Sequence, residues 1–297
     1  MRPRPGVALL ALPAVSLVSL SLSGCAESGS TASGTPVGSA SATTTKPTSA
    51  PSEPRTPEEF LARAREAMSG QKGWTFTVKG NEGLLYQGSQ STATYKATVR
   101  RTQSPLALHS TGTTYTKGVA KPEEVYVVDG TGYVKKGGTE ARWKSGALSD
   151  PAIANAVEDP VAALDAFGAY AREEHTGSGV LAVTSAAGQV ELSVSTAPAA
   201  LTAVRDRGAV KKAVRELAPT LEKLRAAGIT APEDRIVVQN VEEVLSLDAT
   251  TYRIRSHRFR CTFLIPYRGQ NLRYSQDVTE RAQGPYTGTI TLPTDVG

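Results

Sequence analysis

Segments that alternate apolar and polar side chains constrain the fold of this chain more than any other feature. Residues 74–78 read Trp-Thr-Phe-Thr-Val, and residues 190–195 read Val-Glu-Leu-Ser-Val-Ser. A period of two places alternate side chains on opposite faces of a β-strand. Strands with one apolar face are typical of antiparallel sheets whose other face is exposed to water. The pattern therefore predicts an antiparallel sheet.

Turn signals join such strands into hairpins. Asp129-Gly130 separates two β-forming runs, 124–128 and 131–135, and Asp-Gly is a strong hairpin signal. A second hairpin is predicted to pair 180–184 with 190–196. Further strands are predicted at 91–102, 105–116, around Trp143, and at 236–241, 244–247, 251–265, 271–278 and 287–292.

The first predicted helix spans residues 57–69. Thr56 and Glu59 have the spacing of a capping box, and Pro57 occupies the first helical position. Apolar residues recur at helical spacing along this segment, so one side of the helix should pack against another element.

Other helices are predicted in the middle of the chain. The pairs Asp150-Pro151 and Asp159-Pro160 each have the pattern that begins a helix. A longer amphipathic region spans 198–227, where Gly208 and Pro219 are expected to break or kink the helix.

The order of these elements is helix, strands, helices, strands, helix and strands. Residues 57–297 are numerous enough for one large domain. We therefore predict an α+β fold, with one large curved antiparallel sheet and helices packed on one side of it.

The first residues have a different composition. Arg2 and Arg4 precede an apolar stretch that ends in Leu22-Ser23-Gly24-Cys25. This order is typical of an export signal, and the run before Cys25 looks like a bacterial lipobox. In such sequences the cysteine receives a diacylglycerol and becomes the first residue of the mature protein. We expect a signal peptide at 1–24, a lipidated Cys25 and a location on the extracytoplasmic side of the cell membrane. The alternative is an uncleaved N-terminal anchor helix.

Residues 25–56 are dominated by Ser, Thr, Pro, Gly and Ala. Such a segment cannot bury enough apolar surface to offset the cost of ordering it, so we expect a disordered tether. The formal net charge of the chain is +5, of which Arg2 and Arg4 would leave with the signal peptide. This mild excess suits an anionic membrane surface, and no nucleic-acid partner is expected.

Cysteine and histidine residues are few. Lipidation of Cys25 would leave Cys261 without a disulfide partner, and we interpret it as a small buried hydrophobic residue. His109, His175 and His257 lie in three different segments, which argues against a metal or catalytic site. His257 and Cys261 would share one face of a strand but lie roughly 13 Å apart, too far to bind one metal ion.

No known catalytic motif is present. The sequence has no nucleophile elbow, phosphate loop or dinucleotide fingerprint. Adjacent glutamates at 123–124, 173–174 and 242–243 are interpreted as solvated charges, because neighbours on a strand point to opposite faces. We therefore predict no catalytic residues, no metal, no cofactor and no enzymatic activity.

Residues 253–260 are strongly basic and include the aromatic residue Phe259. On a regular strand, Arg253, Arg255 and His257 would line one face, and Arg258 and Arg260 the other. Anionic lipid headgroups or wall polymers would suit this cluster. The alternative is a strand at the edge of the sheet that its solvated charges protect from aggregation.

The layout resembles the lipid-carrier fold of LolA, LolB and the actinobacterial LppX and LprG lipoproteins. The matching parts are the lipobox and tether, the helix 57–69, the strand 74–78, the hairpin 125–133 followed by Trp143, and the segment 247–252. The resemblance covers most of 57–293 as a layout, although the long helical region 198–227 departs from it. It implies a LolA-like half-barrel closed by helices, with acyl chains held on its concave face.

These observations predict a membrane-anchored, exported, non-enzymatic lipoprotein that binds or carries a lipid or glycolipid. Six residues are the expected ligand-binding set: Trp74, Phe76, Tyr126, Tyr133, Val183 and Phe263. The alternative is a sensor or interaction lipoprotein with a solid core, which would present a sheet surface to another envelope protein.

Overall fold

The structure is a computed structural model that describes residues 53–138, 140–150, 153, 156–174 and 181–296. The predicted signal peptide, Cys25 and most of the predicted tether lie outside the described residues. So do Pro151, at the start of one predicted helix, and His175.

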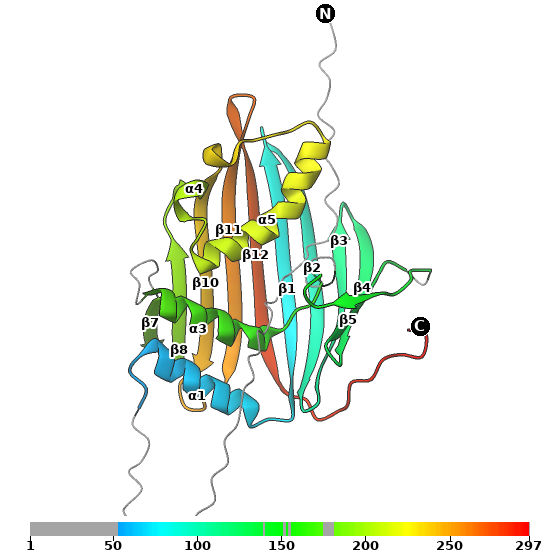
Figure 1. Cartoon of the computed structure of the whole chain (residues 1–297), viewed down its shortest axis with the longest axis vertical. Coiled ribbons are helices and arrows are strands. Elements are labelled where there is room, and N and C mark those ends of the chain that lie inside the picture. Colours follow the sequence, from blue (N-terminus) through cyan, green and yellow to red (C-terminus); the bar gives the residue numbers. More distant parts are fainter. Residues whose placement is uncertain (1–52, 139, 151–152, 154–155, 175–180, 297) are drawn as a thin grey trace, which may run out of the picture.

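Twelve strands form one antiparallel sheet that does not close into a barrel (Figure 1). Their order is β6-β5-β4-β3-β2-β1-β12-β11-β10-β8-β7, with β9 paired to β10. The strand bounds are β1 Gly73–Tyr86, β2 Ser89–Gln103, β3 Leu106–Thr116, β4 Val119–Val128, β5 Thr131–Lys136, β6 Lys144–Ala147, β7 Leu181–Ala186, β8 Gln189–Thr196, β9 Ala199–Ala200, β10 Val237–Asp248, β11 Ile254–Tyr267 and β12 Gln270–Pro285.

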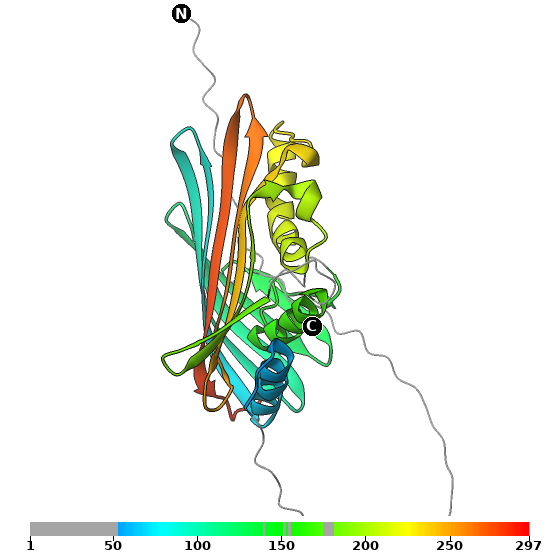
Figure 2. The same cartoon turned by 90° about the vertical axis from the view of Figure 1, so that its left-hand side faces the viewer.

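The helices of the described residues lie on one side of this sheet, which we call the inner face (Figure 2). They are α1 Pro57–Ser69, η1 Pro160–Ala162, α3 Ala163–Glu174, α4 Leu201–Val204, α5 Gly208–Ala226 and η2 Glu233–Arg235. The predicted α+β class with one-sided helices is therefore confirmed.

Local signals predicted several elements well. The capping box begins α1, because Thr56 Oγ1 accepts a hydrogen bond from Glu59 N and Glu59 Oε2 accepts one from Thr56 N. Asp129 and Gly130 join β4 to β5 with positive φ angles of 49° and 74°. Two successive positive φ values are typical of the tight hairpin turns that match the twist of the strands.

The predicted helical region 198–227 is divided differently from the expectation. Gly208 is the first residue of α5 rather than a break within it, and Pro219 lies inside the helix. A proline in a helix removes the hydrogen bond to the carbonyl four residues earlier, here that of Arg215. The helix nevertheless continues through Pro219 to Ala226.

Three strand predictions need correction. The segments 236–241 and 244–247 belong to one strand, β10, which contains a register shift between Val238 and Asn240. The predicted strand 287–292 is absent, because the chain bends around Tyr286, whose hydroxyl donates to the carbonyl of Thr289 at 3.1 Å.

The basic segment 253–260 does not form an edge strand. Its strand β11 lies between β10 and β12, near the middle of the sheet. The pairing of β10 with β11 shifts near Ile254, so Arg255 is exposed whereas His257 is buried, against the expected shared face. Arg258 and Arg260 both pair with Asp277, at 2.6 and 3.2 Å.

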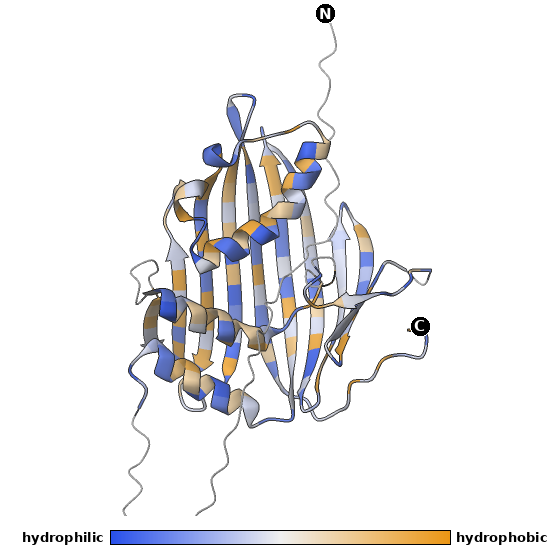
Figure 3. Ribbon diagram, in the orientation of Figure 1, coloured by the Kyte–Doolittle hydropathy of each residue, from blue (hydrophilic) through white to orange (hydrophobic). Residues whose placement is uncertain are grey.

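The hydrophobic core lies between the helices and the inner face, and positions along each strand alternate between hydrophobic and hydrophilic (Figure 3). The first core residue of the described part is Phe60. Within the described part, every buried residue of this core lies between Phe60 and Val278, so a segment that begins at Glu53 retains all of them.

Candidate functional site

The structure separates the six predicted ligand-binding residues. Trp74, Phe76 and Phe263 are almost fully buried within the core on the inner face. Val183 is half-buried on the edge strand β7.

Tyr126 and Tyr133 are paired across β4 and β5. Their positions alternate with the buried core residues Val125, Val127 and Val134, so the two tyrosines lie on the outer face. Tyr126 stacks on His109 there, with ring centroids 4.2 Å apart. One cavity on the inner face therefore cannot be lined by all six predicted residues.

The inner face contains buried glutamates that were predicted to be solvated. Glu243 on β10 has no exposed side-chain surface, whereas its neighbour Glu242 is partly exposed. Lys212 Nζ donates to Glu243 Oε1 at 2.6 Å, and the Tyr170 hydroxyl donates to Glu243 Oε2 at 2.7 Å. The prediction that all these glutamate pairs are solvated is wrong, and Glu123 is likewise buried.

His257 extends this group of charges. Its Nε2 lies 2.7 Å from Glu243 Oε1, and its Nδ1 lies 2.8 Å from Glu280 Oε2. We call these five residues the ionic cluster: Tyr170, Lys212, Glu243, His257 and Glu280. The cluster joins β10, β11 and β12 to helices α3 and α5.

The ionic cluster shifts the pKa values of its members. Burial alone would raise the pKa of Glu243, but Lys212 and His257 outweigh it and hold the pKa well below its usual range. Burial and the charge of Lys212 lower the pKa of His257, but Glu280 and Glu243 outweigh them and raise it. The cluster therefore favours ionised Glu243 beside protonated His257.

A pattern in the sequence could have identified Glu243. Val241, Leu245 and Leu247 are buried on the same strand at a spacing of two, and Glu243 occupies the missing position of this series. An acidic residue at a core position usually has a buried partner. Lys212 could not be chosen as that partner from the sequence, because the charged region near it also contains Lys211 and Arg215.

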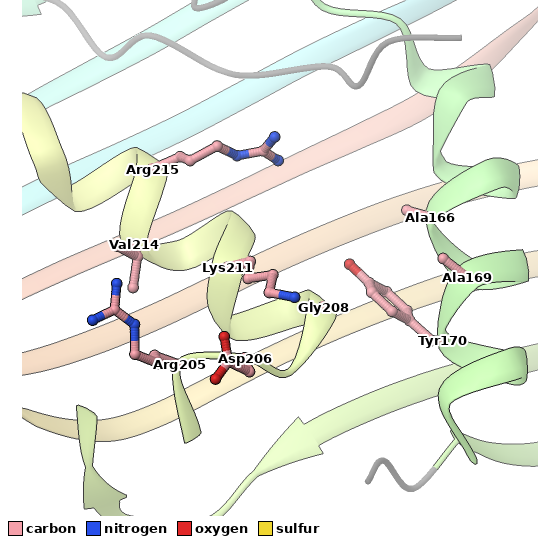
Figure 4. Close-up of a pocket in the computed structure, with 9 residues that line it drawn as sticks. All are labelled: Ala166, Ala169, Tyr170, Arg205, Asp206, Gly208, Lys211, Val214 and Arg215. Atoms are coloured by element: carbon pink, nitrogen blue, oxygen red, sulfur yellow. The ribbon is translucent and has the colours of Figure 1, made fainter. Parts of the chain in front are cut away.

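A pocket lies between α3 and α5, directly beside the ionic cluster (Figure 4). Its volume is about 460 Å³. The lining residues are Ala166, Ala169, Tyr170, Arg205, Asp206, Gly208, Lys211, Val214 and Arg215. Tyr170 belongs to both features, because its ring lines the pocket and its hydroxyl is bound to Glu243.

Gly208 allows the two helices to approach at one end of the pocket. A Cβ atom at this position would lie 2.7 Å from the Tyr170 ring and 2.8 Å from a Glu173 oxygen. The backbone N–H of Gly208 donates to Glu173 Oε2 at 3.0 Å. Because the first turn of α5 has unpaired N–H groups, a carboxylate from α3 is a favourable partner there.

The pocket combines an apolar wall with three cations, on Arg205, Lys211 and Arg215, and one carboxylate, that of Asp206. Ala166, Ala169 and Val214 contribute the apolar part, and Figure 4 shows Tyr170 and Lys211 projecting into the gap between the helices. Arg205 forms an ion pair with Glu233 at 3.0 Å.

Lys211 and Arg215 are exposed and form no ion pair with another described residue. An anion bound in the pocket would therefore have two cations available to it.

A second pocket of about 460 Å³ lies beside α1 and the turn between β10 and β11. It is lined by Glu53, Pro54, Arg63, Glu66, Ala67, Thr251 and Tyr252. Its two carboxylates and single arginine make it less favourable for an anion than the pocket between α3 and α5.

Cys261 is fully buried next to Gln276, and burial raises its thiol pKa well above the ordinary value. Within the described residues, no group of three or more His, Cys, Asp and Glu side chains is arranged to hold a metal ion. No helix of the described part is long and apolar enough to span a bilayer.

Comparisons with known proteins identify no family. No family model and no curated protein matches the chain. Matching solved structures include the ywiB protein from Bacillus subtilis, at 8% identity, with 74% of this chain and 98% of that chain covered and a TM-score of 0.23.

A DUF1329 family protein from Desulfovibrio piger is 8% identical, with 80% and 96% of the two chains covered and a TM-score of 0.29. A β-barrel-like DUF1849 protein from Brucella abortus is 7% identical, with 72% and 100% covered and a TM-score of 0.25. Scores this low do not establish a shared fold, so these structures add nothing to the assignment of function.

Proposed function

We propose that this protein is an exported lipoprotein, anchored through Cys25, that binds an amphipathic ligand with an acidic head, such as an anionic lipid or glycolipid. The pocket between α3 and α5 is the observation that carries this proposal. Its volume of about 460 Å³ lies within the range typical of small-molecule sites.

The lining of the pocket supports this class of ligand. The acidic head would contact Lys211 and Arg215, while the apolar part would contact Ala166, Ala169 and the ring of Tyr170. Burial of apolar surface contributes about 25 cal/mol per Å², and charge-assisted hydrogen bonds would fix the orientation of the head. Binding of this kind requires no covalent step and no cofactor.

Native mass spectrometry of the segment Glu53–Gly297, purified from a lipid-containing bacterial host, tests this proposal. We expect a bound amphiphile that is released by denaturation and recovered in an organic extract. A bare protein mass, unchanged after incubation with phosphatidylglycerol or an acidic glycolipid, would overturn the proposal.

A charge-reversal variant identifies the pocket as the binding site. Lys211→Glu/Arg215→Glu should reduce ligand occupancy at least tenfold. The matched control is Lys79→Glu/Lys96→Glu, because these two exposed lysines are paired across β1 and β2, away from the pocket. It changes the net charge equally and should retain the ligand. Equal loss in both variants would argue against this pocket.

The core packing favours a second candidate function. Phe76 and Phe263 have no exposed surface, as expected of a protein whose inner face is solid. Under this alternative the protein is an interaction lipoprotein that presents a surface to another envelope protein. It would give a bare mass in the same experiment, together with capture of a specific envelope partner.

A further inference from the structure

Three hairpins turn at the same end of the sheet, opposite α1 (Figure 1). They connect β1 to β2, β3 to β4, and β11 to β12. The turn residues are Gln87-Gly88, Lys117-Gly118 and Arg268-Gly269, and all six have positive φ angles. We call the segments 84–91, 114–122 and 265–274 the tip surface.

The tip surface contains most of the exposed large hydrophobic residues of the described part. Leu85, Tyr115 and Val119 are 37%, 44% and 56% exposed. The remaining residue of this kind is Leu106, at the start of β3 and therefore at the opposite end. Single exposed hydrophobic residues are ordinary. Here three of them lie on neighbouring hairpins, so exposed apolar side chains are concentrated at one end of the molecule.

Positive charge accompanies these residues. Lys117, Lys121, Arg268 and Arg273 are exposed, and none of the three segments contains an aspartate or glutamate. The C-terminal part of α5 lies against β1, since the Thr220 hydroxyl donates to Glu82 Oε1 at 3.1 Å, and its last turn adds Lys223 and Arg225 against Glu222.

The hairpins support one another. The rings of Tyr86 and Tyr267 lie 5.4 Å apart, and the guanidinium of Arg268 lies 5.1 Å from the centre of the Tyr267 ring. Leu85 is paired with Arg273 across β1 and β12. An apolar side chain and a cation are thus held side by side before any partner binds.

We infer that the tip surface docks on an anionic lipid bilayer. Leu85, Tyr115 and Val119 would enter the boundary between headgroups and acyl chains, where partly apolar side chains are favourable. The four cations would lie among the lipid phosphates, and each basic residue near such a surface contributes to attraction. Binding would be weak and reversible, because the apolar area is small.

The basic tip surface, whose three segments contain no acidic residue, favours an anionic partner, and the unequal heights of its hairpins favour a bilayer over a protein. The β3–β4 hairpin turns earlier than the β1–β2 hairpin at this end of the sheet. Thr116, the last residue of β3, pairs with Ala93 of β2, and Ala93 pairs with Glu82 of β1. Strand β1 continues beyond Glu82 to Tyr86 before it turns. The tips therefore form separate protrusions at different heights. A deformable headgroup layer can accommodate such protrusions, whereas a protein would need a matching shape.

This inference is independent of ligand binding in the pocket. Co-sedimentation of the segment Glu53–Gly297, which lacks Cys25, with vesicles containing phosphatidylglycerol and phosphatidylcholine tests it. We expect binding at low salt that weakens as salt is added, and at least tenfold weaker binding to pure phosphatidylcholine. Equal binding to both kinds of vesicle, or no binding to either, would overturn the inference.

Two variants assign the binding to the tip surface. Lys117→Gln/Lys121→Gln/Arg268→Gln/Arg273→Gln should weaken vesicle binding at least tenfold, and Leu85→Ser/Tyr115→Ser/Val119→Ser should weaken it severalfold.

The control Lys79→Gln/Lys96→Gln/Leu106→Ser changes exposed residues outside the tip surface and should bind like the unmodified segment. Unchanged vesicle binding in both tip variants, or binding of the tip surface to an envelope protein but not to vesicles, would overturn the inference.

Discussion

Two buried carboxylates on the inner side of the sheet, Glu243 and Glu158, have opposite surroundings. Glu243 is enclosed by Lys212, His257 and Tyr170, all within 2.7 Å. Glu158 is 3% exposed, the strongest charge effects on it come from Glu280 and Glu123, and its Oε2 has no hydrogen-bond partner among the described residues. Equal burial therefore accompanies pKa shifts in opposite directions, because the partners differ.

The polar surroundings of Glu158 are formed by β2, β3 and β4. The ring of Tyr95 lies across Gly112, between the buried residues Ser110 and Thr114 on the same strand. Burial, followed by the charges of Glu280 and Glu123, raises the pKa of Glu158 well above its ordinary value. We call the ionic cluster the matched half of the inner face. We call the group of Glu158, Tyr95 and Gly112 the unmatched half, because the strongest charge effects on Glu158 come from other carboxylates.

The largest expected effect comes from breaking the matched half. Lys212→Met would remove one of the two cations beside Glu243, the other being protonated His257, and loss of one partner of a buried pair costs about 3–5 kcal/mol of unfolding free energy. Lys211→Met is the control, because Lys211 is exposed on the same helix and its removal should cost less than about 0.5 kcal/mol. Urea unfolding measures both.

The double variant Lys212→Met/Glu243→Gln sharpens this result. Removing the Glu243 carboxylate as well should recover part of the unfolding free energy lost in Lys212→Met. Compared with the two single variants, the double variant should give a coupling energy of about 1 kcal/mol or more. A loss below about 1 kcal/mol in the single variant would show that Glu243 does not depend on Lys212.

A smaller effect is expected from crowding the unmatched half. Gly112→Ala would place a Cβ atom 2.7 Å from the Tyr95 hydroxyl oxygen and 2.9 Å from its ring. Overpacking of a buried site costs about 1–3 kcal/mol. Gly138→Ala is the matched control, since nothing lies within 4 Å of its Cβ position. Equal thermal midpoints for the two variants would show that Tyr95 can move aside.

The smallest expected effect, counted per pH unit, is a pH dependence that separates the two halves. A raised pKa of Glu158 means that the folded protein keeps a proton that the unfolded chain loses above about pH 4.3. Unfolding free energy should therefore fall as pH rises from there, by at most about 1.4 kcal/mol per pH unit. Glu158→Gln should flatten this decline above about pH 5.

The matched half contributes in other pH windows. The raised pKa of His257 gives stability that is present below about pH 6.5 and is lost as pH rises through the folded value. The lowered pKa of Glu243 gives stability that is lost as pH falls below about 4.3. His257→Gln should therefore remove the decline above about pH 6.5. An unchanged pH profile in both variants would refute these assignments.

The sequence alone predicted those elements that are stabilised by interactions between residues close together in the chain. The capping box at Thr56 and Glu59 predicted α1 with its observed bounds, and Asp129-Gly130 predicted the turn between β4 and β5. These interactions join residues a few positions apart, so the pattern itself contains both partners. The alternation of apolar residues predicted the antiparallel sheet for the same reason.

Only the tertiary structure decided the partners of the buried charges and the composition of the sites. Lys212 and Tyr170 lie 31 and 73 positions from Glu243, and the sequence contains other cations that fit equally well. The order of the strands brought three distant hairpins to one end of the sheet, and it placed Tyr126 and Tyr133 on the face opposite Phe76. Such choices depend on how all elements pack together, because each pair of charges gains its stability only in the solvent-excluded environment that the whole fold creates.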